Sequence, residues 1–332
     1  MKYINIELPD YFCRVGDSPL LFQLNMTPPK TLLEHVRRYA DLHVDNAYGV
    51  AATPVSGIVI LRETAPGPLQ YAISKPLVAM VLQGSKRVSM GEHSLDFGAG
   101  ESLLISNHVP TVSQIIQASQ AVPYYSLVME LDTTVIADLI SEIGAMPLAV
   151  QEPLRVAPTE VEFADTVLRL LRLLDQPHHL AVLERSLVRE LHFWLLSGRH
   201  GGAMRALGVA DSHAQRIARA VAILREKYAQ PIRIETLAHA ASMSISAFHT
   251  HFRSITSLTP LQFQKQLRLI EARRRMLHEG VSITHASDAV GYESVPQFTR
   301  EYARLFGQPP ARSIRQARAE AESAIASAAK TM

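Results

Sequence analysis

Apolar positions in the last third of the chain recur at helical spacing. Between residues 260 and 279 they fall at Phe263, Leu267, Ile270 and Leu277. This spacing predicts one buried face of a helix. The helix is expected to begin after Thr259, where Thr-Pro-Leu-Gln combines a capping box with proline at the first helical position, and to end at Gly280. About twenty residues at 1.5 Å each predict a rod of about 30 Å.

Two similar segments flank this rod, at residues 234–260 and 283–310. Phe248 aligns with Phe298, and Phe252 with Tyr302, at an offset of 50 residues. Each segment reads as a short helix, a turn of small residues and an amphipathic helix with an aromatic pair at i and i+4. Such a pair of helices is a helix-turn-helix, whose second helix enters the major groove of DNA. A rod of about 30 Å would place two such units on successive major grooves, which lie about 34 Å apart.

The first half of the chain has a different pattern. From Val55 onward, short β-rich runs are separated by Gly and Pro clusters, which is typical of a β-sandwich or small barrel. Helical periodicity returns at residues 134–143 and again at 159–197, where two helices joined at Pro177 predict an αα-hairpin. This hairpin either packs onto the β-domain or forms the seam of a dimer. Residues 201–212 are short and Gly-rich and are expected to be a linker.

Charge is divided unevenly along the chain. Residues 212–318 carry a net charge of +9, whereas residues 1–211 carry −6. A helical domain with a solvated basic face would show the same excess, but the repeated units favour a nucleic-acid module. The lone Cys13 excludes an internal disulfide framework, and the N-terminus shows neither a signal peptide nor a membrane span. We therefore expect a cytoplasmic protein.

The second helix-turn-helix resembles the AraC/XylS family of transcription regulators. The family pattern A-x-x-x-G-Y-x-S-x-x-x-F-x-R-x-Y-x-x-x-F-G-x-x-P begins here at Ser287, in place of the usual alanine. Its other positions are occupied by Gly291, Tyr292, Ser294, Phe298, Arg300, Tyr302, Phe306, Gly307 and Pro310. The β-rich runs are in turn similar to the cupin-type N-terminal domain of one branch of this family. In that branch the resemblance implies a domain that senses an effector or mediates dimerisation.

Candidate base-reading residues are those that lie between the core aromatics of the two recognition helices. In the first unit these are Ser246, His249 and Thr250, with Arg253 at the edge of the groove. In the second they are Val295, Pro296, Thr299 and Arg300, while Gln297, Arg304 and Arg253 are expected at phosphates or against a neighbouring helix. Arg300 is the strongest candidate, because arginine donates bidentately to guanine. Family members often carry Arg where Thr250 stands, so the first unit is expected to bind more weakly or to use the threonine methyl.

No metal site or cofactor is predicted. Cupin enzymes hold a metal with two closely spaced His and a carboxylate, whereas His93 and His108 are isolated and fifteen residues apart. The alternative to a regulator is therefore a cupin-type enzyme fused to a DNA-binding module, and metal analysis would distinguish the two. A nonspecific architectural DNA binder is a third alternative, and it would bind random and promoter sequences equally.

The sequence thus predicts an α+β multidomain protein with a cupin-like β-barrel, a helical hairpin and an all-α domain with two helix-turn-helix units. The expected ranges are 1–150, 151–200, a linker at 201–212, the DNA-binding domain at 213–318 and a tail at 319–332. We predict a sequence-specific transcription regulator without catalytic residues, and the family resemblance implies activation. Its expected partners are double-stranded promoter DNA, RNA polymerase, a small-molecule effector and a second copy of itself.

Overall fold

The computed structural model describes residues 30–45, 49–91, 93–144, 153–209 and 211–319. Cys13 and all but the first residue of the expected tail lie outside these ranges. In the described chain, no helix combines the length and the apolar character that a membrane crossing requires.

The N-terminal domain is built from two antiparallel sheets. The order of the six-stranded sheet is β1 (Val50–Ala52), β2 (Ile58–Glu63), β9 (Tyr124–Glu130), β4 (Leu77–Gln83), β7 (Glu101–Ile105) and β10 (Leu154–Pro158). The order of the four-stranded sheet is β3 (Gln70–Ser74), β8 (Val109–Gln117), β5 (Ser85–Met90) and β6 (His93–Gly98). The predicted cupin-like domain is confirmed, with one refinement. In the described residues each ladder stays within its own sheet, so the domain is an open sandwich rather than a closed barrel.

The central strand β4 shows why the domain is layered. Its buried run Leu-Val-Ala-Met-Val-Leu has no polar face, because both of its faces are covered. Ala79 and Val81 belong to the core between the two sheets, whereas Val78, Met80 and Leu82 face the helices on the other side. Alternation along one strand therefore supplies two separate hydrophobic cores.

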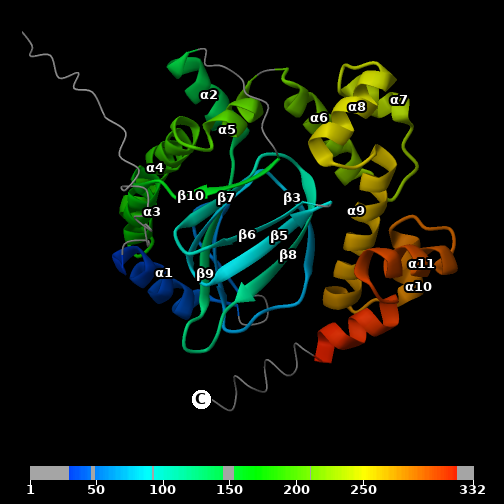
Figure 1. The fold of residues 1–332 in the computed structure, drawn as a ribbon, viewed down its shortest axis with the longest axis horizontal. Coiled ribbons are helices and arrows are strands. Elements are labelled where there is room, and N and C mark those ends of the chain that lie inside the picture. The colour runs from blue at the N-terminus through cyan, green and yellow to red at the C-terminus, as the bar shows by residue number, and fades with distance from the viewer. Residues whose placement is uncertain (1–29, 46–48, 92, 145–152, 210, 320–332) are drawn as a thin grey trace, which may run out of the picture.

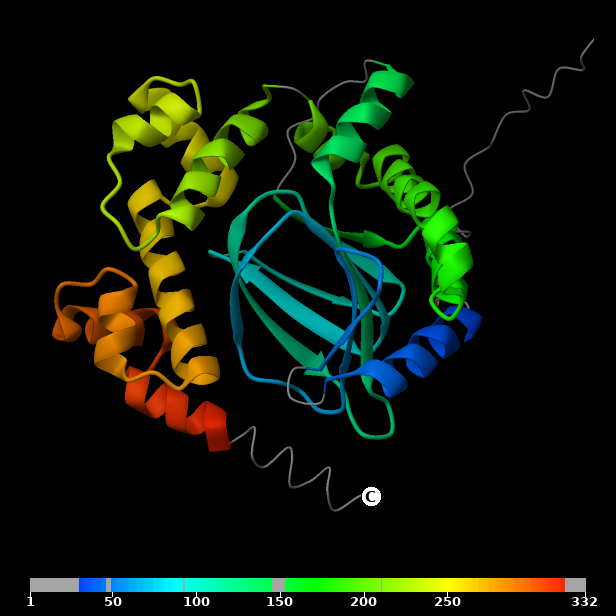
Figure 2. The ribbon, with the colours of Figure 1, turned by 180° about the vertical axis from the view of Figure 1, so that it is seen from behind.

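Helices cover the outer face of the six-stranded sheet (Figures 1 and 2). They are α1 (Lys30–His43), α2 (Thr133–Ile143), α3 (Val161–Leu173), α4 (Pro177–Ser197) and α5 (Gly201–Gly208). The predicted αα-hairpin is α3 with α4, and its inner residues Phe163, Val167 and Leu191 join the same core as β2 and β9. The hairpin thus packs onto the β-domain, and its outer face leaves Val182 and Leu183 exposed.

The expected linker needs a correction. Most of residues 201–212 form helix α5, in which Ala203 and Met204 are buried. A Cβ at Gly208 would lie 2.6 Å from Cγ2 of Ile136, so the glycines of this segment allow close packing against α2 rather than a free hinge. The pattern of small residues is the same for a linker and for a tightly packed helix, and only the tertiary contact distinguishes them.

The range expected for the hairpin also contains a strand. Residues 154–158 form β10, which pairs with β7 at the edge of the six-stranded sheet. Thr159, just before α3, does not cap this helix, and its Oγ1 lies 2.6 Å from Oγ of Ser102 in β7. The N-cap position of α3 is taken by Glu160, which makes no capping hydrogen bond through its side chain. Its carboxylate instead accepts a hydrogen bond from the backbone N–H of Arg199 at 2.6 Å.

The C-terminal domain is helical and lies along the four-stranded sheet, on the side away from α1, α3 and α4 (Figure 1). Its helices are α6 (His213–Glu226), α7 (Ile234–Ala240), α8 (Ile245–Thr256), α9 (Pro260–Arg274), the π-helical η1 (Arg275–Glu279), α10 (Ile283–Ala289) and α11 (Val295–Phe306). Residues 310–319 are helical as well. The molecule is therefore ordered as helices, six-stranded sheet, four-stranded sheet and C-terminal helices.

Candidate nucleic-acid interface

The backbone of the C-terminal domain repeats itself as the sequence predicts. Helices α7 and α8 form the first helix-turn-helix, and α10 and α11 form the second. The turn is left-handed at Ser242 in one unit and at Gly291 in the other, with φ of 52° and 83°. Each second helix also ends on a left-handed residue, Ser257 or Gly307, with φ of 61° and 76°. The two turns are therefore 49 residues apart in the sequence and the two helix ends are 50 residues apart, so the repeat is present in the backbone.

Each recognition helix is anchored by its aromatic pair. The rings of Phe248 and Phe252 lie 5.4 Å apart at 57°, and those of Phe298 and Tyr302 lie 5.6 Å apart at the same angle. All four side chains are 0 % exposed. They are core residues, as expected, and burying them turns the opposite faces of α8 and α11 outward.

The expected contact residues of the first unit lie on that outer face. Ser246, His249, Thr250 and Arg253 are all exposed on α8. The Thr250 hydroxyl donates to the backbone oxygen of Ser246 at 3.2 Å, which leaves the threonine methyl group as the group that can approach a base. Their contact with DNA stays a prediction.

The second unit has the same arrangement on α11. Pro296, Gln297, Arg300 and Arg304 are exposed, whereas Val295 and Thr299 are half-buried. Gln297 donates to Oε1 of Glu301 at 3.4 Å, so it lies against its own helix. In the described part of the chain, Arg253, Arg300 and Arg304 form no hydrogen bond or ion pair. These charges are free to meet phosphates or base edges.

The rod between the units forms as predicted. The Thr259–Gln262 capping box is complete, with hydrogen bonds of 2.9 and 3.3 Å. Helix α9 has 15 residues and η1 has 5, which gives about 30 Å, and Gly280 ends the helix with φ of 68°.

The arginines of the rod do not line a DNA-facing stripe. Arg274 and Arg275 form ion pairs with Glu271, and Arg268 donates to backbone carbonyls. The basic excess of this segment is therefore partly internal, whereas Arg253, Arg300 and Arg304 on the recognition helices have no ion-pair partner among the described residues.

Potential metal-ligating side chains are dispersed in the described residues. No group of three or more His, Cys, Asp and Glu side chains is arranged to hold a metal ion there. His93 is exposed at the start of β6, and His108 immediately precedes β8, with β5 between these two strands.

Comparison with protein families assigns both domains. The model of the AraC-type transcriptional regulator N-terminus matches residues 54–203, and that of a helix-turn-helix domain matches residues 237–316. The chain belongs to the AraC family. The two matches fall on the β-domain with its helical hairpin and on the paired units of the C-terminal domain.

Curated relatives match about a third of this chain. The chain is 32% identical over 98 residues to the HTH-type transcriptional activator RhaS of Escherichia fergusonii, which is 30% of this chain and 35% of that protein. It is 31% identical over 108 residues to RhaS of an Enterobacter species, which is 32% of this chain and 38% of that protein. The chain thus spans just over a third of the length of the relatives it matches.

Solved structures share the whole architecture. An apo ToxT from Vibrio cholerae strain SCE256 superposes with a TM-score of 0.53 at 9% identity, covering 78% of this chain and 97% of that one. ToxT of strain O395 bound to (E)-4-(8-methylnaphthalen-1-yl)but-3-enoic acid gives 0.52 at 9% identity, covering 78% and 99%. At this identity the likeness shows the fold alone.

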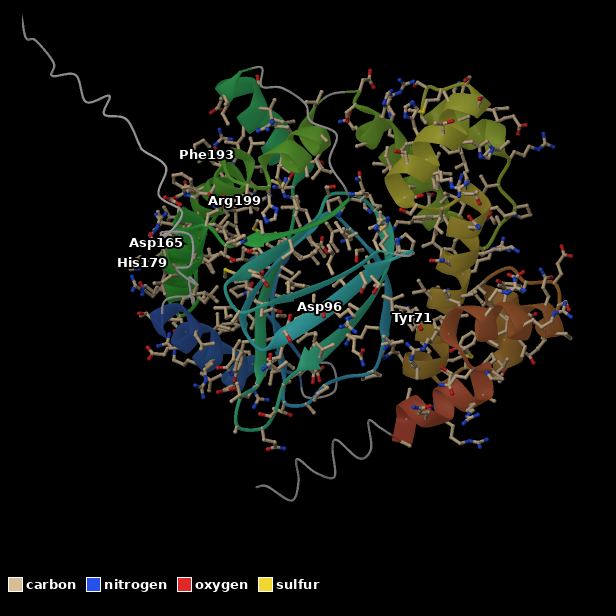
Figure 3. The ribbon with its side chains drawn as sticks, in the orientation of Figure 1. Tyr71, Asp96, Asp165, His179, Phe193 and Arg199 are labelled. Carbon is tan, nitrogen blue, oxygen red and sulfur yellow. The ribbon has the colours of Figure 1, made fainter. Side chains whose placement is uncertain are left out.

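In this AraC-family protein one strand touches both helix-turn-helix units. Ile73 of β3 packs against the core of the first unit. Two residues earlier, the ring of Tyr71 lies 4.6 Å from that of Phe306, at the end of α11. The Arg273 guanidinium lies 5.8 Å from the Tyr71 ring and 5.4 Å from the Phe306 ring, within cation–π range of both. Tyr71 lies between the sandwich and the C-terminal helices (Figure 3).

A second contact joins the domains at α6. Nη1 of Arg225 lies 3.1 Å from Nδ1 of His108. Burial, together with the nearby Arg225 charge, lowers the pKa of His108 to about 4. The imidazole is therefore neutral at pH 7 and accepts the hydrogen bond.

Sequence reasoning missed these interdomain residues. The run Gln70–Ser74 is short and alternates, with Tyr71 and Ile73 on one face, and this alternation was the available signal for a strand. His108 was considered in the sequence only as a possible metal ligand. Its partner Arg225 is 117 residues away, so nothing local in the sequence could indicate the pair.

Ser287, which replaces the alanine of the family pattern, is fully buried in α10. Its Oγ has no hydrogen-bond partner among the described residues. Leaving a buried hydroxyl unsatisfied costs about 1–3 kcal/mol. The departure from the pattern therefore weakens local packing without touching the outer face of the second unit.

We expect Ser287→Ala to stabilise the protein by about 1 kcal/mol, because it removes the unsatisfied hydroxyl. The measurement is urea unfolding of the full chain, followed by circular dichroism. The matched control is Ser282→Ala on the same helix, where Oγ accepts the N-capping hydrogen bond from His285 at 3.2 Å. That change should cost about 1 kcal/mol. If both variants changed the free energy of unfolding in the same direction, the interpretation of the Ser287 hydroxyl as unsatisfied would be wrong.

We also expect Tyr71→Ala to loosen the contact between the domains. Without the ring, amide hydrogen exchange should accelerate in β3 and in the last turn of α11, while β6 stays unchanged. Tyr71→Phe keeps the ring and should exchange as the unaltered protein does. Equal protection in the alanine variant would show that this ring does not hold the domains together.

Proposed function

We propose that this protein is a sequence-specific DNA-binding regulator of transcription. The observation that carries the proposal is a pair of aromatic-anchored recognition helices, joined along the chain by a rod of about 30 Å, that expose arginines with no ion-pair partner among the described residues. That length agrees with the distance between successive major grooves, about 34 Å. Arg300 would read a guanine, and Arg253 and Arg304 would contact phosphates.

The N-terminal domain would sense a small-molecule effector, mediate dimerisation, or do both. In support, ToxT, which shares the fold, has been solved with an unsaturated fatty acid bound. In this chain β3 and the Arg225–His108 contact join the sandwich to both halves of the C-terminal domain. An effector that binds one domain arrangement better would therefore shift the population able to occupy both half-sites.

The remaining parts of the proposal come from the family. The matched relatives are named activators, so we propose activation, with RNA polymerase as a partner and the cytoplasm as the compartment. The outer face of α4, with Val182 76% and Leu183 45% exposed, would form the seam of a homodimer.

We propose no catalytic residue and no cofactor. Metal analysis of the purified protein tests the alternative of a cupin-type enzyme, which predicts a stoichiometric metal.

Selection of bound DNA from a random pool tests the proposal directly. We expect enrichment of a bipartite site whose two halves lie about one helical turn apart, 10–10.5 base pairs. Repeating the selection with cell extract tests for an effector. Recovery of DNA without a common sequence, at affinities equal to random DNA at fixed salt, would indicate a nonspecific architectural binder instead.

Arg300→Ala should reduce affinity by about 1–3 kcal/mol and relax specificity at one base position. The physical reason is the loss of a bidentate donor to a base edge. The measurement is binding to the selected site and to its single-base variants. Arg304→Ala is the control and should weaken all of these sequences alike. A uniform loss for Arg300→Ala would make Arg300 a phosphate contact.

A further inference from the structure

One side chain in the middle of the rod, Arg268, contacts both the segment before the first helix-turn-helix unit and the turn of the second unit. Arg268 donates from Nε to the carbonyl of Tyr228 at 2.7 Å and from Nη1 to the carbonyl of Gly291 at 2.8 Å. Its Nη2 lies 3.3 Å from the carbonyls of Ala229 and Gln230. Residues 228–230 follow α6 on the side of the first unit, whereas Gly291 is the turn of the second. One guanidinium therefore bonds at once to the segment that leads from α6 into the first unit and to the turn of the second unit.

A second rod residue strengthens the same attachment. Gln264, one helical turn earlier, donates from Nε2 to the carbonyls of Tyr228 and Gln230 at 3.0 and 2.7 Å. The carbonyls just after a helix have no intrahelical donor. Gln264 and Arg268 supply those donors, and the arginine also places a positive charge at the negative end of α6.

The segment that leads into the first unit also touches the turn of the second unit, backbone against backbone. A Cβ on Gly291 would lie 1.9 Å from the carbonyl oxygen of Ala229 and 2.8 Å from its carbonyl carbon. Glycine is required here for its φ of 83° and because any side chain would push the first unit away. The equivalent turn of the first unit tolerates Ser242 at φ of 52°, so the constraint belongs to this contact and not to the turn alone.

Beside these two residues on the rod, Lys265 contacts the second recognition helix. Its Nζ lies 2.8 Å from Oε1 of Glu301 on α11, and the Tyr292 hydroxyl donates to Oε2 of the same carboxylate at 2.8 Å. The contact between Ala229 and Gly291 is thus surrounded by polar contacts that begin on the rod at Gln264, Lys265 and Arg268.

We propose that Arg268 is a positioning residue that fixes the distance and rotation between the two recognition helices, and so selects the spacing of the two DNA half-sites. The inference rests on the proposed function, because spacing has meaning only if both units read DNA. Arginine suits this role because its planar, permanently charged fork donates in several fixed directions, which lysine cannot do. A shift of one base pair between half-sites rotates one by about 35°, which a rigid pair of units would reject.

The test measures binding of the full-length protein to DNAs that carry the two selected half-sites at different separations. The unaltered protein should show one sharp optimum. Arg268→Lys and Arg268→Met should reduce the discrimination between the optimum and its one-base-pair neighbours by about fivefold or more. Affinity for a single half-site should stay unchanged, because no base-reading side chain is altered.

Arg274→Met is the matched control. Arg274 also lies on the rod, but it pairs with Glu271 and Glu279 within the same helical segment and reaches neither unit. The Arg274→Met substitution removes one positive charge from the rod, as Arg268→Met does, and should keep the sharp spacing optimum. Gln264→Met, which loses two of the hydrogen bonds, serves as the milder variant if circular dichroism shows that the Arg268 variants unfold.

The outcomes separate the two proposals. If the unaltered protein selects no bipartite site, the proposed function fails. If it selects one, but the Arg268 variants or, where they unfold, Gln264→Met keep the spacing profile of Arg274→Met, the positioning role of Arg268 is wrong. A loss of single half-site binding equal to the loss at the paired site would likewise make Arg268 a merely structural residue.

Discussion

Burial of one aromatic pair in each unit is the constraint on which the candidate interface depends. Phe248 with Phe252, and Phe298 with Tyr302, must leave water, and at i and i+4 they occupy one face of their helices. The opposite face is then solvent-exposed without any further requirement, and Arg300 lies on it. The hydrophobic effect thus orients the recognition helices, and the polar side chains only have to be of the right type.

Orientation within a unit does not set the relation between units. That relation comes from the rod, from the close approach of Ala229 and Gly291, and from the carbonyls that Arg268 satisfies. Buried backbone polar groups must find partners, so a single arginine serving several carbonyls is a strong reason for the two units to stay in one arrangement. On the opposite side, β3 of the sandwich contacts both units. The sandwich is therefore in contact with the pair rather than with one unit.

Much of this fold is readable from local sequence. The rod, its capping box, its terminal glycine and both helix-turn-helix units have their signals within a few residues of the elements they define. The long strands β4 and β9 are apolar enough to be recognised. The short strands β1, β3 and β10 are not, because three to five residues carry little periodicity. Helix α5 was mistaken for a linker for a related reason, since Gly201 and Gly208 are small to permit close packing rather than motion.

The sequence by itself determined which residues would be buried, which faces of α8 and α11 would be exposed, and that two similar units would flank a rod. These features follow from periodicity and capping, which act over one or two helical turns. Only the tertiary structure decided that the arginines of the rod are engaged, that His108 meets Arg225, and that Tyr71 reaches Phe306. Those contacts join residues far apart in the chain, and their geometry exists only once the layers have packed.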